Sequence, residues 1–225
     1  MNAFRLAPLF LFVAACSQDA APPPPPANPR ADAPAADAAI AGVTAPSVAP
    51  ADAFLAALAA HCGKAYAGRI VANRPASATP DPFEGKALVM HVRGCEDPAR
   101  ELRVPFHVGD DHSRTWVLTR TADGLRLKHD HRHADGSPDP VTLYGGDTAS
   151  AGTAQRQEFP VDAQSVAMFE REGLTASVTN TWAMEIEPGT RFVYELGRPA
   201  GRLFRVEFDL ATPVALPPAP WGTGD

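Results

Sequence analysis

The sequence lacks the marks of several large functional classes. It has no block of lysine and arginine, and 26 acidic against 20 basic residues give a net charge of -6. This balance argues against nucleic-acid binding. It also lacks the G-x-S-x-G elbow, the H-E-x-x-H zinc motif, the P-loop and the dinucleotide fingerprint. Because these common catalytic and nucleotide-binding motifs are absent, the function cannot be assigned from a motif.

Long hydrophobic runs are also missing. The apolar run Leu9 to Ala15 is too short to span a bilayer, and no second candidate membrane segment follows. Arg5 precedes this run, and small residues end it. That layout is typical of a signal peptide. We therefore expect residues 1–15 to be a targeting segment.

The end of this segment resembles the lipobox of bacterial lipoproteins, here Val13-Ala14-Ala15-Cys16. The resemblance covers the first sixteen residues and implies that Cys16 is lipidated and becomes the new N-terminus. Ser17, rather than aspartate, follows the cysteine, which in this family favours the outer membrane. The implied location is the cell envelope, on the periplasmic face of the outer membrane. The alternative is an ordinary cleaved signal followed by a chance cysteine.

Cysteine is scarce, with three in the chain. If Cys16 carries lipid, Cys62 and Cys95 remain as a pair, and an oxidising periplasm favours a disulfide between them. Closing that loop stabilises the fold by roughly 3–4 kcal/mol in the chain-entropy model. A catalytic thiol at Cys95 is the alternative, but the stretch RGCED offers no obvious base.

Composition divides the chain into segments. Residues 16–50 are rich in alanine and proline and nearly free of large apolar side chains, so we expect a disordered linker. Residues 51–212 suit one folded domain. Residues 213–225 form a proline-rich C-terminal tail.

The folded part has a hydrophobic period of two. Hairpin signals such as Asp123-Gly124 separate the apolar-polar alternations. We expect short helices at 51–63 and 162–173. Strands are expected at 64–72, 86–95, 101–109, 113–121, 125–133, 140–146, 155–160, 180–187, 191–197 and 202–210. This order predicts an all-β fold, an antiparallel meander barrel or sandwich of about ten strands with one or two short helices.

Two resemblances bear on this domain. Its meander is similar to the calycin architecture in topology alone, without a diagnostic motif. The stretches SRTWVLTRT and HDHRHADG resemble a family of uncharacterised exported bacterial proteins, which implies no particular activity.

A histidine-rich strand is the main candidate for a metal site. His129, His131 and His133 alternate, so a strand places them on one face. Imidazoles at this spacing can converge on Zn²⁺ or another divalent transition metal. His107 or His91 from a neighbouring strand is the expected further ligand. Such a site with an open position would support a metal-dependent enzyme, so whether the protein is an enzyme stays open.

A carboxylate could complete this site. The order His129, His131, Asp135 partly resembles the first motif of the cupin barrels, with aspartate where glutamate is usual. The second cupin motif is missing, because no histidine follows Pro199-Ala200-Gly201. The alternative is a solvated strand end whose histidines make ordinary cross-strand hydrogen bonds.

Aromatic residues suggest a different site. Trp116, Trp182, Tyr144 and Tyr194 could line a ligand cavity in the mouth of a barrel, or could belong to the core. The leading hypothesis is a lipid-anchored envelope protein whose barrel binds a small molecule or an envelope component. The alternatives are the metal-dependent enzyme and a structural or assembly subunit that meets another envelope protein.

Overall fold

The computed structural model describes residues 48–76 and 81–223. The expected signal peptide, Cys16 and nearly all of the expected linker lie outside these ranges. The described part contains α1 (Pro50–Ala59), α2 (Ala163–Arg171), the 3₁₀ helix η1 (Thr175–Thr179) and ten strands. The strands are β1 (Ala65–Arg74), β2 (Leu88–His91), β3 (Glu101–Val108), β4 (Asp111–Arg120), β5 (Leu125–His131), β6 (Tyr144–Asp147), β7 (Arg156–Pro160), β8 (Thr181–Glu187), β9 (Arg191–Gly197) and β10 (Leu203–Val214).

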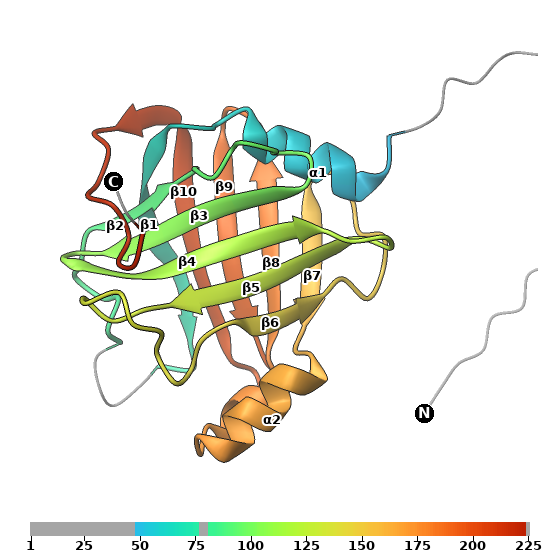
Figure 1. Cartoon of the computed structure of the whole chain (residues 1–225), viewed down its shortest axis with the longest axis vertical. Coiled ribbons are helices and arrows are strands. Elements are labelled where there is room, and N and C mark those ends of the chain that lie inside the picture. The colour runs from blue at the N-terminus through green and yellow to red at the C-terminus, as the bar shows by residue number, and fades with distance from the viewer. Residues whose placement is uncertain (1–47, 77–80, 224–225) are drawn as a thin grey trace, which may run out of the picture. The chain divides into compact units, whose positions relative to one another are not determined.

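The ten strands form one antiparallel sheet in the order β6-β5-β4-β3-β2-β1-β10-β9-β8-β7. The sheet curls into a nearly closed barrel, so that β3 to β6 cross in front of β7 to β10 at a steep angle (Figure 1). The all-β prediction is therefore confirmed. None of the described helices is long and apolar enough to cross a membrane.

Glycine permits the two edge strands to meet. The backbone N–H of Asp162, just after β7, donates to the carbonyl of Gly145 in β6 at 2.9 Å. A Cβ atom on the adjacent Gly146 would lie 1.8 Å from the carbonyl oxygen of Pro160. Because no side chain fits there, the Gly145-Gly146 pair allows the sheet to come together at this seam.

Several strand ends differ from the sequence prediction: β2 is shorter than the expected 86–95, and β6 begins later than the expected residue 140. The histidine strand ends at His131, because Asp135 accepts hydrogen bonds from the backbone and hydroxyl of Ser137 and so organises a turn. The last strand is longer than expected, since β10 continues to Val214 and pairs with Ala65 in β1. The ordered sheet thus reaches into the expected proline-rich tail.

The first helix packs against one end of the barrel. Phe54, Leu55 and Leu58 of α1 are fully buried in the hydrophobic core. Directly after this helix, Cys62 forms a disulfide with Cys95, as the sequence predicted. The bond ties the end of the helix covalently to the connection between β2 and β3.

The second helix lies at the other end of the barrel (Figure 1). The carboxylate of Asp162 caps α2 by accepting from the backbone N–H of Ser165 at 2.7 Å. The same carboxylate lies 2.6 Å from the ammonium group of Lys128 in β5. These contacts hold α2 against the barrel and position Phe169, which is buried.

Candidate ligand cavity

A cavity of about 240 Å³ lies inside the barrel, on the side of α2 and η1. All four aromatic residues singled out from the sequence, Trp116, Tyr144, Trp182 and Tyr194, line it. They come from β4, β6, β8 and β9, so the curvature of the sheet brings together side chains that lie far apart in the chain. Phenylalanines from β3, α2 and β10 add to the wall: Phe106, Phe169 and Phe204.

The aromatic rings of the wall pack against one another. Trp116 stacks on Tyr194 with ring centroids 4.5 Å apart, and on Phe106 at 5.0 Å. Rings that contact each other in this way have few alternative positions. The wall therefore offers flat, apolar surfaces that are already arranged in the protein.

His129 is a buried polar residue of this wall. Its Nδ1–H donates to the backbone carbonyl of Tyr144 at 3.1 Å, and its Nε2 accepts from the hydroxyl of Tyr194 at 2.9 Å. Because a carbonyl only accepts, these partners require one neutral tautomer. Burial lowers the pKa of His129 to about 3. The imidazole is therefore neutral at physiological pH, and both nitrogens are hydrogen bonded.

The other two histidines of this strand have different surroundings. The Nδ1 of His131 lies 4.0 Å from a carboxylate oxygen of Asp139, and burial lowers its pKa. His133 lies beyond the end of β5, is half exposed, and approaches Asp139 at 3.7 Å. Thus His129 alone of the three is buried in the aromatic wall.

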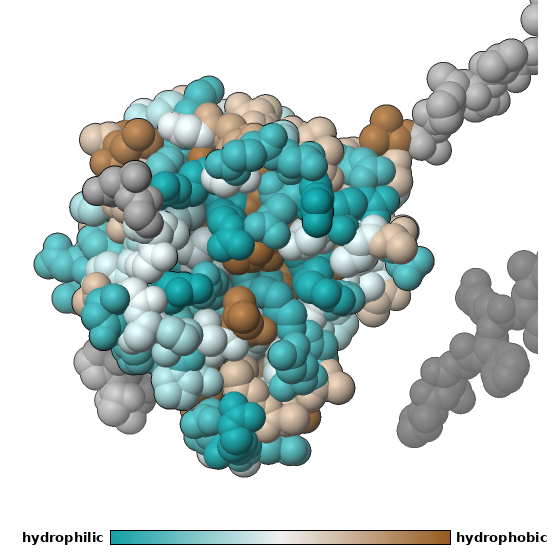
Figure 2. Space-filling model, viewed as in Figure 1, coloured by the Kyte–Doolittle hydropathy of each residue, from teal (hydrophilic) through white to brown (hydrophobic). Residues whose placement is uncertain are grey.

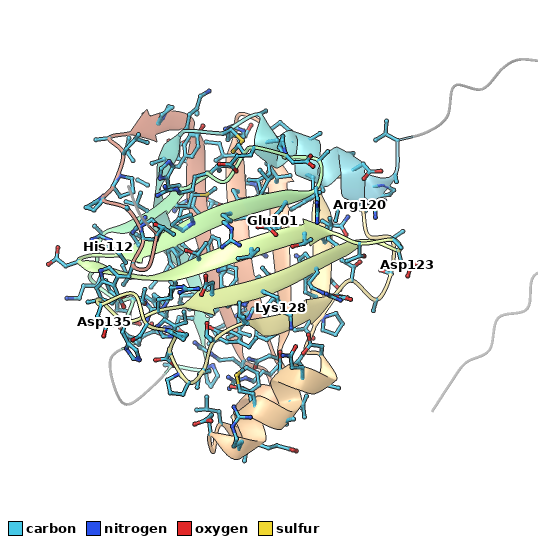
Figure 3. All side chains as sticks on the ribbon, viewed as in Figure 1. Glu101, His112, Arg120, Asp123, Lys128 and Asp135 are labelled. Carbon is cyan, nitrogen blue, oxygen red and sulfur yellow. A yellow bond between two sulfur atoms is a disulfide. The ribbon has the colours of Figure 1, made fainter. Side chains whose placement is uncertain are left out.

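The expected partners from neighbouring strands lie elsewhere. His107 is adjacent to Phe106, so its side chain points to the opposite face of the sheet. There its Nδ1 is 2.7 Å from the Nδ1 of His112, and burial lowers its pKa to about 4. His91 is also buried, and Asp135 lies in the turn after β5. Figure 3 shows His112, near the start of β4, and Asp135, in the turn after β5, at the same end of the sheet.

Residues 48–76 and 81–223 contain no group of three or more histidine, cysteine, aspartate or glutamate residues arranged to hold a metal ion. Coordination by the Nε2 of His129 would also require breaking its hydrogen bond with Tyr194. The metal site built on the histidine strand stays a prediction from the sequence.

Three partly exposed arginines line the cavity, and we call the part of the wall that they form its mouth. Arg114, Arg198 and Arg202 line it together with Ser177 and Asn180. No aspartate or glutamate is among its lining residues in the described part of the chain. The cavity thus combines an apolar aromatic interior with a positively charged entrance.

These arginines were not singled out from the sequence. Arg198 and Arg202 flank the turn Pro199-Ala200-Gly201, and a hairpin turn necessarily brings its two ends together. That signal was present in the sequence. The end of the barrel at which the hairpin lies, however, depends on how the whole sheet curls.

A second hollow, of about 250 Å³, lies on the outer face of the sheet. Arg93, Arg103 and Arg132 line it, but Asp130 lies 3.0 Å from Arg132 and 3.8 Å from Arg103. A counter-charge is therefore among the lining residues of the outer hollow, whereas none of the described lining residues of the inner cavity is acidic. The face seen in Figure 2 is mainly hydrophilic, with small separate apolar areas.

Comparison of the chain with protein-family models, with curated proteins and with solved structures finds no match.

Proposed function

We propose that this protein is a lipid-anchored cell-envelope protein whose barrel binds a small aromatic molecule. The observation that supports the binding role is the cavity of about 240 Å³ lined by Trp116, Tyr144, Trp182 and Tyr194. A concave, mostly apolar pocket with a few polar groups is the usual form of a small-molecule site.

The size of the cavity restricts the ligand. Pockets for drug-sized ligands have volumes of about 300–1,000 Å³, and this one is smaller. A compact molecule with one or two rings is therefore the best fit, and the stacked walls favour a flat one.

Calorimetric titration of the domain that begins at residue 48 with indole, 2-naphthol and 2-naphthamide tests the binding role. We expect at least one of these neutral aromatic probes to bind with 1:1 stoichiometry. Absence of binding by all three at about 1 mM, which corresponds to roughly -4 kcal/mol, would overturn the proposal.

A matched pair of variants locates the binding. Ser177 lines the mouth, whereas Thr175 lies in the same 3₁₀ helix and is exposed outside the cavity wall. We expect Ser177→Phe to block the entrance and weaken binding at least ~10-fold, about 1.4 kcal/mol. Thr175→Phe should bind as the unmodified protein does. Equal effects of both substitutions would place the ligand elsewhere.

The proposed anchor rests on the sequence Val13-Ala14-Ala15-Cys16, which lies outside the described residues. Stable membrane attachment by lipid needs more than one acyl chain. Mass spectrometry of the N-terminal peptide should therefore show a multiply acylated Cys16, and Cys16→Ala should release the protein from the membrane fraction. Detection of an unmodified Cys16 in the membrane-free periplasmic fraction would contradict the anchor.

A further inference from the structure

The charge at the mouth indicates the chemical class of the ligand. We infer that the cavity binds an aromatic carboxylate, with its ring between the stacked side chains and its carboxylate on Arg198. This inference rests on the proposed binding function and specifies the ligand of the same site. The choice of Arg198 depends on which of the three arginines at the mouth has no carboxylate partner in the protein.

Arg114 and Arg202 each have a carboxylate partner. Arg114 forms an ion pair with Asp111 and lies over the ring of Phe83 at 5.3 Å. Arg202 lies 3.6 Å from a carboxylate oxygen of Asp81. Both charges are therefore balanced by groups of the protein itself.

Arg198 differs from these two. Within the described ranges, no aspartate or glutamate oxygen lies within 4.0 Å of its guanidinium group, which instead contacts neutral partners. Its Nε donates to the side-chain oxygen of Asn180 at 2.6 Å, and its Nη2 donates to the hydroxyl of Ser177 at 3.4 Å. Because a guanidinium group has five N–H donors, three of them remain to bind an incoming acceptor.

Burial makes a counter-ion favourable at this position. Arg198 is partly buried, and desolvation together with the positive charge of Arg202 lowers its pKa. A cation removed from water without a partner is costly, and an anion placed beside it offsets that cost. Since Asn180 is itself buried and holds Nε, the guanidinium plane is already oriented.

The order of groups along β9 sets the orientation of the ligand. Tyr194 lies in the stacked aromatic wall, Leu196 also lines the cavity, and Arg198 follows the end of the strand at the mouth. A ligand that places a ring beside Tyr194 therefore extends toward Arg198. A planar carboxylate suits this position, because the guanidinium fork can bind it through two parallel hydrogen bonds.

Paired ligands test the inference. 2-Naphthoate and 2-naphthamide have the same ring and nearly the same shape, but only the first is charged. We expect the unmodified domain to bind 2-naphthoate at least ~10-fold more tightly than 2-naphthamide, as one charge-assisted hydrogen bond implies. Equal affinities would overturn the carboxylate assignment, whereas the binding of 2-naphthamide would still support the proposed function.

Variants then assign the preference to one residue. Arg198→Gln should remove the preference for 2-naphthoate and change the affinity for 2-naphthamide less than ~3-fold, because the cavity itself is intact. Arg100→Gln is the matched control. This exposed arginine lies in the loop before β3, beside the backbone of Arg120 at the α1 end, so its loss changes net charge equally without altering the mouth.

Two outcomes distinguish a wrong assignment of Arg198 from damage to the fold or the cavity by the substitution. If Arg198→Gln retains the preference for 2-naphthoate, Arg198 does not bind the carboxylate and the inference is wrong. If this variant no longer binds 2-naphthamide, its fold or cavity has changed. In that case the affinities of both ligands for the unmodified domain and for Arg100→Gln decide whether Arg198 binds the carboxylate. If Arg100→Gln also loses the preference for 2-naphthoate, the preference is a net-charge effect and the assignment is wrong.

Discussion

The imidazole of His129 and the hydroxyl of Tyr194 form a 2.9 Å hydrogen bond inside the barrel. This bond joins β5 to β9, which are separated by five strands in the order of the sheet. It exists in the neutral form of His129, whose other nitrogen donates to the carbonyl of Tyr144. The stability of the barrel should therefore depend on the protonation of one buried residue.

We expect the free energy of unfolding to fall as the pH is lowered from about 6.5 to about 3. The pKa of His129 is about 3 in the folded protein and about 6.5 in the unfolded chain, so the unfolded chain binds more protons over this range. Each extra proton gives a slope of about 1.4 kcal/mol per pH unit. Urea denaturation at several pH values measures this slope.

His107, whose pKa is about 4, adds to the slope in the unmodified protein. His129→Gln should therefore reduce the slope without abolishing it. His133→Gln is the control, because this histidine is half exposed and lies outside the strand. An unchanged slope in the His129 variant would show that His129 is not the buried neutral group.

Reduction of the disulfide should lower the melting temperature. Cys62 and Cys95 are 33 residues apart in sequence, and closing a loop of this length restricts the unfolded chain by about 3–4 kcal/mol. The double variant Cys62→Ser/Cys95→Ser should have the same melting temperature as the reduced protein. A thermal scan with and without reductant that shows no difference would contradict this prediction.

Gly146→Ala should destabilise the barrel by about 1–3 kcal/mol or more. The new Cβ atom would lie 1.8 Å from the carbonyl oxygen of Pro160, so the seam between β6 and β7 must open. Gly197→Ala is the matched control, because its Cβ atom would meet only backbone oxygens at 3.9 Å. Chemical denaturation of both variants tests the seam, and equal stabilities would argue against it.

Asp162→Ala should weaken the attachment of α2. The substitution removes the cap on Ser165 and leaves the ammonium group of Lys128 without its partner, at a cost of about 1–2 kcal/mol. Asp147→Ala breaks an ion pair with Arg126 in which both side chains are about half exposed, so it should cost less than about 1 kcal/mol. Hydrogen exchange of the amides of α2 would distinguish local loosening from global unfolding.

Local patterns were sufficient to predict most of the secondary structure. Alternation such as Phe204, Val206 and Phe208 is visible in the sequence because one face of each strand is buried, and all three are core residues. Turn residues and the N-cap at Asp162 are local signals as well. The Cys62–Cys95 pair was predicted differently, because assigning Cys16 to the lipobox leaves two of the three cysteines.

The features that depend on curvature could not be predicted in this way. Gly146 and Pro160 meet because the sheet returns on itself, and nothing in their own neighbourhoods indicates that contact. By contrast, Arg198 lies beside Asn180 because β8 and β9 are neighbouring strands in which Thr181 pairs with Gly197. Spacing alone placed the histidines on one face, but the distant Tyr194 determines what His129 binds.

The link between α1 and the sheet has a mechanical consequence. A force applied to the chain ahead of Pro50 would pass through the helix to Cys62, and from there across a covalent bond to Cys95. The load would then enter the barrel beside β3, instead of peeling β1 away from β10 one hydrogen bond at a time. For a domain held at a surface by its N-terminal side, this arrangement would resist shear.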